Sequence, residues 1–360
     1  MADNQVNQVR IVDIARLAGV SAGTVDRVIH KRGRVDPEKL EKIEKIIKEI
    51  NYEPNLVARF LASRKLYTLA VVVPTFSKGD YWELVCSGID NAAAELRKFR
   101  VEIKYFQFNQ YDRKSFSDVA QLLKLEKCDG VLLATLFGKE VMEFSIYLKN
   151  RQIPFIYIDS AIEGQDDLAY FGGDSYQDGL IAAKLLLKEI GTKTDIFFAH
   201  IHFKYDEISV QMRTREQGFM AGLEQQNFQG TVYHLEINPD DFAEDLLVLE
   251  KIIDKNRGKV GGIVLNSRIY ELLKVLESLS KPHRRKVVLL GHEAIERNVQ
   301  ALLSGKITYL LSQRPELQGS DALKALGNYI LFHQRPEKVN FMPIDILIKE
   351  NVIYYSNYKL

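Results

Sequence analysis

Polar side chains follow the apolar runs in the second part of this 360-residue chain, at the point where each run ends. Asp159 follows residues 155–158, and Gln313 follows residues 307–312. In open parallel sheets, ligands bind outside the carboxyl ends of the strands, so we expect these side chains to line one cleft. The candidates for this cleft are Asp159, Asp174, Arg215, Asn266, Glu293 and Gln313. A guanidinium and carboxylates offer two-pronged hydrogen bonding to vicinal hydroxyls or a carboxylate, although each residue alone is more often a helix cap or a surface charge.

Aromatic residues lie near the same strand ends. Tyr81 and Trp82 follow the first apolar run, residues 69–73, and Trp82 is the only tryptophan of the chain. An aromatic face there can stack on the apolar face of a sugar ring. The alternative for Trp82 is ordinary packing in the core. Phe137 is a further, weaker candidate.

The chain shows none of the common catalytic loops. It has no Gly-x-Gly-x-x-Gly after a strand, no Walker A loop, no Gly-x-Ser-x-Gly elbow and no His-Glu-x-x-His. His200 and His202 share one face of a strand end, with Asp206 nearby, but the spacing fixes no further metal ligand. We therefore expect no metal, no cofactor and no enzyme activity.

Short β-rich runs alternate with helical stretches after residue 67, and these elements must position the side chains above. The β-rich runs are residues 69–73, 101–105, 130–134, 155–158, 195–199, 231–235, 262–265 and 287–291. The helical stretches include residues 82–99, 177–190, 212–226 and 269–279. Such alternation builds parallel sheets from βαβ units, and we expect two doubly wound lobes. A closed eight-fold barrel is the competing architecture.

The first part of the chain has a different, helical pattern. A helix over residues 11–18 ends at Gly19, Ser21 caps a second helix over residues 22–29, and a third helix follows its cap Asp36. Two helices joined by so tight a turn are typical of proteins that place the second helix in the major groove of DNA.

Composition and charge agree with a DNA-binding head on a globular body. Residues 1–66 carry 13 Lys and Arg against nine Asp and Glu, whereas the remainder carries 36 against 39. A basic head on a mildly acidic body is the asymmetry expected when one end meets a polyanion. With 46% hydrophobic residues, two cysteines, no bilayer-length apolar run and no signal-peptide pattern at its start, the chain is expected in the cytoplasm without a membrane partner.

The runs IVDIARLAGVSAGTVDRVIH at residues 11–30 and NYEPNLVAR at residues 51–59 resemble the LacI/GalR family of bacterial transcription regulators. The resemblance covers the whole chain and is most specific in the head. It implies a small all-α helix-turn-helix domain at residues 9–53, a hinge helix or linker at 54–66, and an α/β body at 67–360. That body would have two doubly wound parallel-sheet lobes like a periplasmic sugar-binding protein. The strand-end and aromatic residues would hold a small-molecule effector, a sugar or sugar derivative, between the lobes.

The resemblance also places DNA contacts residue by residue. They fall on Ser21, Ala22, Gly23, Thr24, Asp26, Arg27, His30, Arg34, Asn55, Ala58 and Leu61. Arg27 can bind O6 and N7 of a guanine, and Leu61 matches the leucine that enters the minor groove and kinks it, with ordinary packing as its alternative. The family usually has serine at the position of Asp26, which we expect to fix the Arg27 guanidinium.

The resemblance thus implies a repressor that acts as a homodimer on a near-palindromic operator with a flexible central step. One alternative is a sugar-processing or dehydrogenase enzyme that carries a regulatory head, which would need a cofactor loop or paired catalytic carboxylates. A solute-binding protein would need a signal peptide and would lack the basic head. A helix-turn-helix of another family on the same kind of body is the remaining alternative.

Overall fold

The structure, a computed structural model, describes residues 11–29, 33–50, 52, 65–201 and 209–355. The chain divides into two compact units, Met1–Arg64 and Lys65–Leu360, which we call the head and the body. Among the described helices, none combines the length and apolarity needed to cross a bilayer. Most of the predicted linker lies outside the described residues, as do the predicted DNA contacts His30, Asn55, Ala58 and Leu61.

The head contains α1 (Ile11–Ala18), α2 (Ala22–Ile29) and α3 (Pro37–Glu49). The tight turn between the first two helices forms because Gly19 adopts a φ of 69° and the Ser21 side chain accepts a hydrogen bond from the Thr24 amide at 3.2 Å. The inner faces of the three helices bury one small core, made of Ile14, Ala15, Ala18, Val25, Val28 and Ile43. The predicted all-α helix-turn-helix fold is confirmed.

Lobe 1 of the body is an open six-stranded sheet with helices on both faces. Its strands are β1 (Tyr67–Pro74), β2 (Val101–Phe108), β3 (Gly130–Ala134), β4 (Phe155–Ile158), β5 (Ala169–Gly172) and β11 (Val339–Phe341). Its helices are α5 (Tyr81–Leu96), α6 (Arg113–Leu125), α7 (Gly138–Asn150) and α14 (Pro315–Phe332), with a 3-10 turn η1 (Arg97–Phe99) after α5. The strand order is β11-β5-β4-β3-β1-β2, and every neighbouring pair is parallel.

Lobe 2 repeats this plan. Its strands are β6 (Ile196–Ile201), β7 (Val232–Ile237), β8 (Val260–Ile263), β9 (Val287–His292), β10 (Tyr309–Ser312) and β12 (Asp345–Leu347). Its helices are α8 (Ser175–Ile190), α9 (Val210–Gln225), α10 (Ala243–Lys255), α11 (Ile269–Glu277), α12 (Lys281–Lys286), α13 (Glu296–Leu303) and α15 (Val352–Tyr355). The order is β12-β10-β9-β8-β6-β7, parallel except for the pair of β10 with β12.

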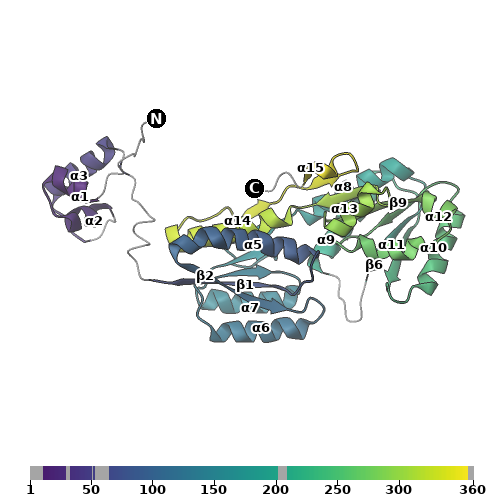
Figure 1. Ribbon diagram of the computed structural model, residues 1–360, viewed down its shortest axis with the longest axis horizontal. Helices are drawn as coiled ribbons and strands as arrows, with labels where there is room; N and C mark the ends of the chain where they lie inside the picture. Colours follow the sequence, from purple (N-terminus) through teal and green to yellow (C-terminus); the bar gives the residue numbers. More distant parts are fainter. Residues whose placement is uncertain (1–10, 30–32, 51, 53–64, 202–208, 356–360) are drawn as a thin grey trace. The chain divides into compact units, whose positions relative to one another are not determined.

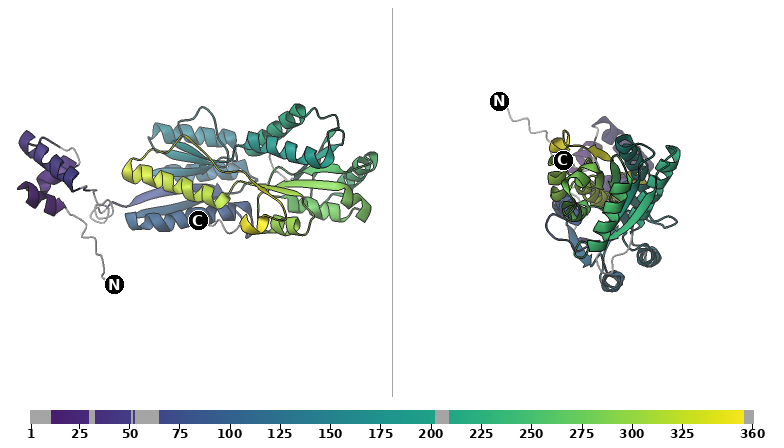
Figure 2. Two further views of the ribbon diagram at one scale, coloured as in Figure 1. Left: turned by 90° about the horizontal axis from the view of Figure 1, so that it is seen from above. Right: turned by 90° about the vertical axis from the view of Figure 1, so that its right-hand side faces the viewer.

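The chain passes between the lobes three times, after β5, after β10 and between β11 and β12. Two separate open sheets lie side by side in the body (Figure 2). The two doubly wound lobes predicted from strand–helix alternation are therefore confirmed, and the competing closed barrel is wrong. The barrel fails because neither sheet joins its first strand to its last, and each keeps two edges.

Helices cover both faces of each sheet. In lobe 1, α5 and α14 lie on one face and α6 and α7 on the other (Figure 1). In lobe 2, α8 and α9 pack on one face, while α10, α11 and α13 bury the larger core on the other. Strands buried on both faces read as continuous apolar runs rather than as alternation, which is why the sequence shows β1, β3 and β4 so plainly.

Two close helix crossings depend on glycine. A Cβ on Gly179 of α8 would overlap the backbone carbonyl of Arg215 on α9, and a Cβ on Gly218 of α9 would overlap that of Tyr176. The backbones of α8 and α9 therefore touch. This contact brings Asp178, next to Gly179 on α8, within hydrogen-bonding distance of Arg215 on α9. Gly88 on α5 and Gly319 on α14 form the corresponding crossing in lobe 1.

Candidate functional site

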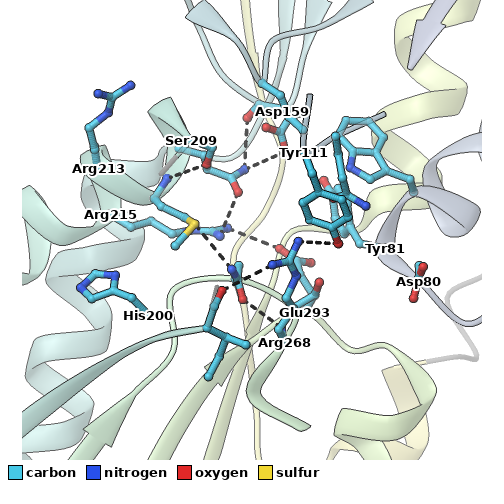
Figure 3. Close-up of a pocket in the computed structure, with 18 of the residues that line it drawn as sticks. Asp80, Tyr81, Tyr111, Asp159, His200, Ser209, Arg213, Arg215, Arg268 and Glu293 are labelled. Carbon is cyan, nitrogen blue, oxygen red and sulfur yellow. Dashed lines mark hydrogen bonds and ion pairs between the residues drawn. The ribbon is translucent and has the colours of Figure 1, made fainter. Parts of the chain in front are cut away.

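A polar pocket of about 260 Å³ is lined by residues of both lobes (Figure 3). Lobe 1 contributes Tyr81 and Trp82 from the start of α5, Tyr111, Phe137 and, after β4, Asp159. Lobe 2 contributes His200 at the end of β6, Gln211 and Arg215 on α9, Asn266 after β8, Arg268, and Glu293 after β9. The pocket thus lies at the carboxyl ends of strands in both sheets, where open α/β folds bind ligands.

Two of its carboxylates lie on unusual backbone. Asp159 has a φ of 81° and Glu293 a φ of 67°, and each directly follows the last residue of a buried strand. The left-handed region is tolerated by Asp and disfavoured for Glu, which has a longer side chain and no local hydrogen bond to offset the strain. Strain of this kind is typical of functional sites, where surrounding structure holds a side chain in a required direction.

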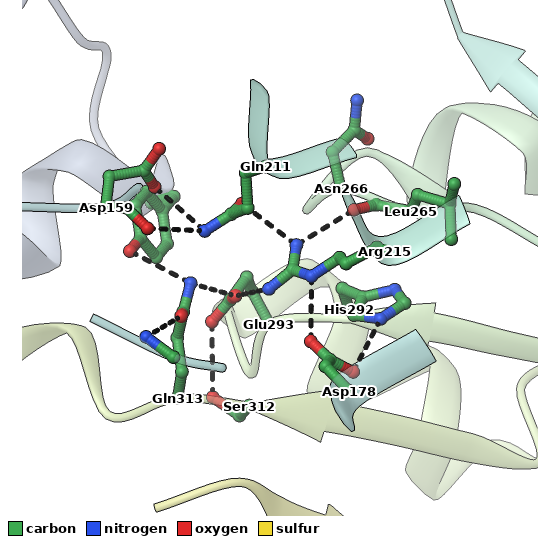
Figure 4. A network of polar contacts seen from close by, with 12 residues as sticks. Asp159, Asp178, Gln211, Arg215, Leu265, Asn266, His292, Glu293, Ser312 and Gln313 are labelled. Carbon is green, nitrogen blue, oxygen red and sulfur yellow. Dashed lines mark hydrogen bonds and ion pairs between the residues drawn. The ribbon is translucent and has the colours of Figure 1, made fainter. Parts of the chain in front are cut away.

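Arg215 is the centre of a buried network (Figure 4). Its side chain is 2% exposed and donates four hydrogen bonds, to Asp178 Oδ2 at 2.7 Å, Leu265 O at 2.9 Å, Gln211 Oε1 at 3.0 Å and Glu293 Oε1 at 3.3 Å. Every nitrogen of the guanidinium is therefore engaged, and the two carboxylates balance its charge. A buried network in which every guanidinium nitrogen donates fixes the orientation of the groups that line the pocket.

His292 supports Asp178 from the opposite side. Its Nδ1 lies 2.8 Å from the carbonyl oxygen of Val264, and its Nε2 lies 3.1 Å from Asp178 Oδ1. The Val264 carbonyl oxygen can only accept, so Nδ1 donates that hydrogen bond, and the two contacts fix the orientation of the ring beside Asp178. The cluster thus places the Arg215 guanidinium and the His292 imidazole beside three carboxyl groups, those of Asp178, Glu293 and Asp159.

The pKa values of the three carboxyl groups differ because the charges around them differ. Burial raises the pKa of Asp159 to about 7, and the nearby Glu293 charge adds to this, against the opposing charge of Arg215. Burial likewise raises the pKa of Glu293. Burial also opposes ionisation of Asp178, but the charges of His292 and Arg215 outweigh it and hold the pKa of this carboxyl below its usual value. Asp159 is therefore the carboxyl without its own balancing charge, and it can both donate and accept near neutral pH.

Hydrogen bonds connect the two lobes across the pocket. Gln211 of lobe 2 donates to Asp159 of lobe 1 at 3.1 Å, and Arg268 of lobe 2 donates to the Tyr111 hydroxyl of lobe 1 at 2.8 Å. Gln313, where the chain passes from β10 to α14, donates to Glu293 at 3.1 Å. The lobes are thus held together by side chains that themselves line or support the pocket.

The structure brings most of the predicted effector residues together. Those that line the pocket are Tyr81, Trp82, Phe137, Asp159, Arg215, Asn266 and Glu293. Trp82 is only 6% exposed, so it is buried in the core and also belongs to the pocket lining. Gln313 lies behind the lining in the network around Glu293. Asp174 is not part of the lining; it caps α8 by accepting from the Gln177 amide at 3.0 Å, because it is the N-cap residue of that helix.

Several residues of the pocket lining and of the network behind it could not be identified as candidates, or were overlooked, in the sequence. Gln211 lies one helical turn before Arg215, and this spacing places both on one face of α9, a signal that the sequence offered. His292 precedes Glu293 at the end of β9 and carried the same strand-end signal. Asp178, inside α8, and Tyr111 and Arg268, in loops, gave none, because only the tertiary structure brings them to the site.

The outer face of α2 is the second candidate site. Ser21, Ala22, Gly23, Arg27 and, beyond the helix, Arg34 are exposed, while Thr24 and Asp26 are half-buried. The Arg27 Nε donates to the Gly23 carbonyl oxygen at 3.2 Å, which lays the side chain along the helix surface. The proposed contact of Asp26 with the Arg27 guanidinium stays a prediction.

Two protein families match this chain, one over most of the body and one over the head. The family described as periplasmic binding protein domain matches residues 69–333, and the family described as bacterial regulatory proteins, lacI family, matches residues 10–55. The crystal structure of a protein assigned as a LacI transcriptional regulator from Bacteroides fragilis matches with a TM-score of 0.74 and 31% identity, over 81% of this chain and 100% of that one.

Two curated relatives are similar over different lengths. The sucrose operon repressor of Pediococcus pentosaceus is 26% identical over 301 residues, which is 82% of this chain and 86% of the repressor. Catabolite control protein A of Staphylococcus epidermidis is 28% identical over 186 residues, which is 52% of this chain and 54% of that protein. The match therefore spans only about half the length of the second relative.

Proposed function

We propose that this chain, which belongs to the lacI family of bacterial regulatory proteins and carries a periplasmic binding protein domain, is a transcriptional repressor controlled by a small molecule. The observation that carries the proposal is the polar pocket lined from both lobes, on a chain whose head presents an exposed helix face. The alternative of an enzyme with a regulatory head has no support from the relatives, which are named as regulators. Because its target is DNA, we place its action in the cytoplasm.

The ligand is a sugar or another molecule rich in hydroxyl groups. Asp159 and Glu293 can accept from hydroxyls, and Asn266 can both donate and accept. Hydroxyl groups suit such a mixed set because each of them donates once and accepts as well. The aromatic side chains of Trp82 and Phe137 add apolar surface on the lobe 1 side, as a sugar ring requires. The printed name of the Pediococcus relative, a sucrose operon repressor, supports the same class.

The head reads DNA through α2. Ala22 and Gly23 are small and exposed, so base recognition depends chiefly on Arg27, which suits a guanine. Two copies of the chain would place two such helices on a near-palindromic operator, with the hinge residues, Leu61 among them, at a flexible central step. Dimerisation, operator symmetry and the hinge contacts rest here on the resemblance alone.

Ligand binding acts through the distance between the lobes. The hydrogen bonds from Gln211 to Asp159 and from Arg268 to Tyr111 exist only while the lobes are close. A ligand that contacts both lobes stabilises that closed arrangement, and closure changes how the body presents the hinge and head.

The test is thermal melting of the full chain against a panel of sugars and sugar phosphates. A ligand present at 100 times its dissociation constant adds about 2.7 kcal/mol of stability. Asn266→Ala should abolish the shift produced by the hit, whereas Asp174→Asn, outside the pocket lining, should retain it. Repeating operator selection from random duplex DNA with and without the hit then shows whether the ligand controls DNA binding. A panel without any shift would refute the sugar class, and a chain that selects no DNA sequence would refute the repressor.

A further inference from the structure

A group of metal-ligating side chains lies at the edge of the pocket, in lobe 2. His200 at the end of β6, His234 on β7 and Glu216 on α9 place one ligand atom each within 4.8 Å of one another. His200 also lines the pocket, where Figure 3 shows its imidazole. The sequence groups His200 with His202 and Asp206, but those two lie outside the described residues, and the structure joins His200 to residues of other elements.

Strand register and helix packing produce this group. Because β6 and β7 are parallel with His200 opposite Glu236, His234 lies diagonally beside His200 on the same face of the sheet. That face is covered by α9, whose Phe219 packs edge-on against Phe198 at 5.0 Å. Glu216, one turn earlier on α9, therefore lies over the two imidazoles. All three side chains belong to regular elements, so the group is held by the fold rather than by a loop.

The distances suit a small ion. His200 Nε2 and His234 Nδ1 are 3.3 Å apart, and His234 Nδ1 is 3.6 Å from Glu216 Oε1. Two nitrogen ligands of a tetrahedral ion with bonds of roughly 2.0–2.1 Å are about 3.3 Å apart. In the absence of an ion, one of these two nitrogens can donate a hydrogen bond to the other. A modest rotation of the partly exposed His234 ring would let both nitrogens bind the same ion instead.

The three side chains of this group differ in exposure: one is buried and two are partly exposed. His200 is 6% exposed and its ring stacks on Phe198 with an interplanar angle of 13°, so it is fixed in place. The side chains of His234 and Glu216 are 45% and 25% exposed, which leaves a path for an ion from solvent. Two imidazoles and one carboxylate form a set that zinc binds while keeping a further position open.

We propose that His200, Glu216 and His234 bind one divalent ion of the zinc type beside the effector pocket. The fourth position is left to water or to a pocket ligand. Glu216 directly follows Arg215 on α9, so the ion would fix this helix to β6 and β7 next to the network that lines the pocket. The proposal does not depend on which effector the pocket binds or on what DNA the head reads.

The test uses the untagged full chain after treatment with a chelator, titrated with Co²⁺ and then with Zn²⁺ in competition. We expect one Co²⁺ per chain, with the visible absorption that marks tetrahedral coordination, displaced by one Zn²⁺. His234→Gln and Glu216→Gln should each raise the Zn²⁺ dissociation constant by at least about tenfold, since loss even of a supporting contact around a metal weakens binding 10- to 100-fold. Both side chains are partly exposed, and circular dichroism verifies that the variants are folded.

His283→Gln is the matched control. His283 lies 2.9 Å from Asp254 in the same lobe, a pair of one imidazole and one carboxylate that lacks a second histidine. This variant should bind Co²⁺ like the unaltered chain. Absence of stoichiometric binding, or binding that neither His234→Gln nor Glu216→Gln weakens, would overturn the proposal. Failure to bind a sugar or DNA would leave it intact, because the titration contains neither.

Discussion

Replacement of Arg215 by methionine tests whether the buried network is held by its one guanidinium. Methionine keeps most of the apolar stem and removes the charge together with four hydrogen bonds. Asp178 and Glu293 would then remain buried, at 4% and 2% exposure, without the cation that balances them. Most of the loss in stability should therefore come from the two buried carboxylates that lose their counter-ion, rather than from the contacts of the arginine itself.

The expected loss follows from what each acceptor keeps. Removing one partner of a buried ion pair costs about 3–5 kcal/mol. Asp178 keeps His292 at 3.1 Å, and Glu293 keeps Gln313 at 3.1 Å and Ser312 at 3.4 Å, so both remain partly satisfied. We therefore expect Arg215→Met to lower the free energy of unfolding of the body by about 3–4 kcal/mol, near the lower end of that range. At roughly 2 °C per kcal/mol for a unit of this size, the melting temperature should fall by about 6–8 °C.

Urea unfolding followed by far-ultraviolet circular dichroism measures this loss. Asp178→Asn and the double variant complete a cycle, in which the double variant should lose less than the sum of the single losses by about 1–3 kcal/mol. Lys306→Met is the matched control, because Lys306 and Glu277 form a pair of 2.6 Å on the surface of the same lobe, with both side chains about half exposed. Exposed pairs contribute about 0–1 kcal/mol. An Arg215→Met loss no larger than that of the control, or strict additivity in the cycle, would refute the reasoning.

Three further predictions concern pH, packing and DNA. Burial raises the pKa of Asp159 from an ordinary 3.8 to about 7, so the folded body holds a proton that the unfolded chain releases. Its free energy of unfolding should therefore fall as pH rises from about 4 to about 7, by roughly 1.4 kcal/mol per pKa unit, and urea titrations of Asp159→Asn should show a flatter profile. Gly218→Ala should lower the free energy of unfolding by about 1–3 kcal/mol, because the added methyl group overlaps the Tyr176 carbonyl. Gly258→Ala is the control: a methyl group there has nothing within 4 Å, so the free energy of unfolding should change by no more than about 0.5 kcal/mol. Arg27→Ala should weaken binding to the selected operator by at least about fivefold in fluorescence anisotropy, with little change on random DNA.

Each of these three has a result that contradicts it. A pH profile of Asp159→Asn that parallels the unaltered chain would show that another group binds the proton. Equal stabilities of the two glycine variants would mean that α8 and α9 do not touch. An Arg27→Ala loss of the same size on random DNA and on the operator would assign Arg27 to the phosphate backbone.

The strand ends were the most predictable part of the site. Asp159 and Glu293 follow strands buried on both faces, and such strands are visible as apolar runs whose carboxyl ends must meet at one edge. Asp174 carried the same signal but caps α8, because it is also the residue before a helix and its carboxylate satisfies that helix's amides. Position at a strand end therefore brings a residue near the cleft without deciding whether its side chain enters it.

The residues that sequence reasoning could not find are those placed by contacts distant in sequence. Asp178 reaches Arg215 only because glycines let α8 and α9 touch, and His234 reaches His200 only through the register of two strands. β11 and β12 each have three residues and lie at the edges of the sheets, where a short strand leaves little periodic pattern.

The three passages of the chain between the lobes are tied to one another and to the pocket. Gln313 in the second passage accepts from the Gly173 amide of the first at 2.9 Å. Arg314, with a φ of 52°, donates twice to Asp345 at the end of the third passage, at 2.7 and 3.0 Å. These contacts join the three connecting segments to one another, so we expect any change in the angle between the lobes to involve all three together.

These connecting segments are one hydrogen bond away from Glu293, a carboxylate that lines the pocket. Gln313 donates to Glu293 at 3.1 Å and lies 3.3 Å from the Tyr81 hydroxyl, so a pocket side chain from each lobe contacts this residue. Under the proposed function, a ligand hydroxyl that donates to Glu293 would compete with Gln313 for that carboxylate. Under the proposed function, ligand binding would then change the hydrogen bonding of Gln313 directly, and coupling from the pocket to the connecting segments would need no chain of intermediate residues.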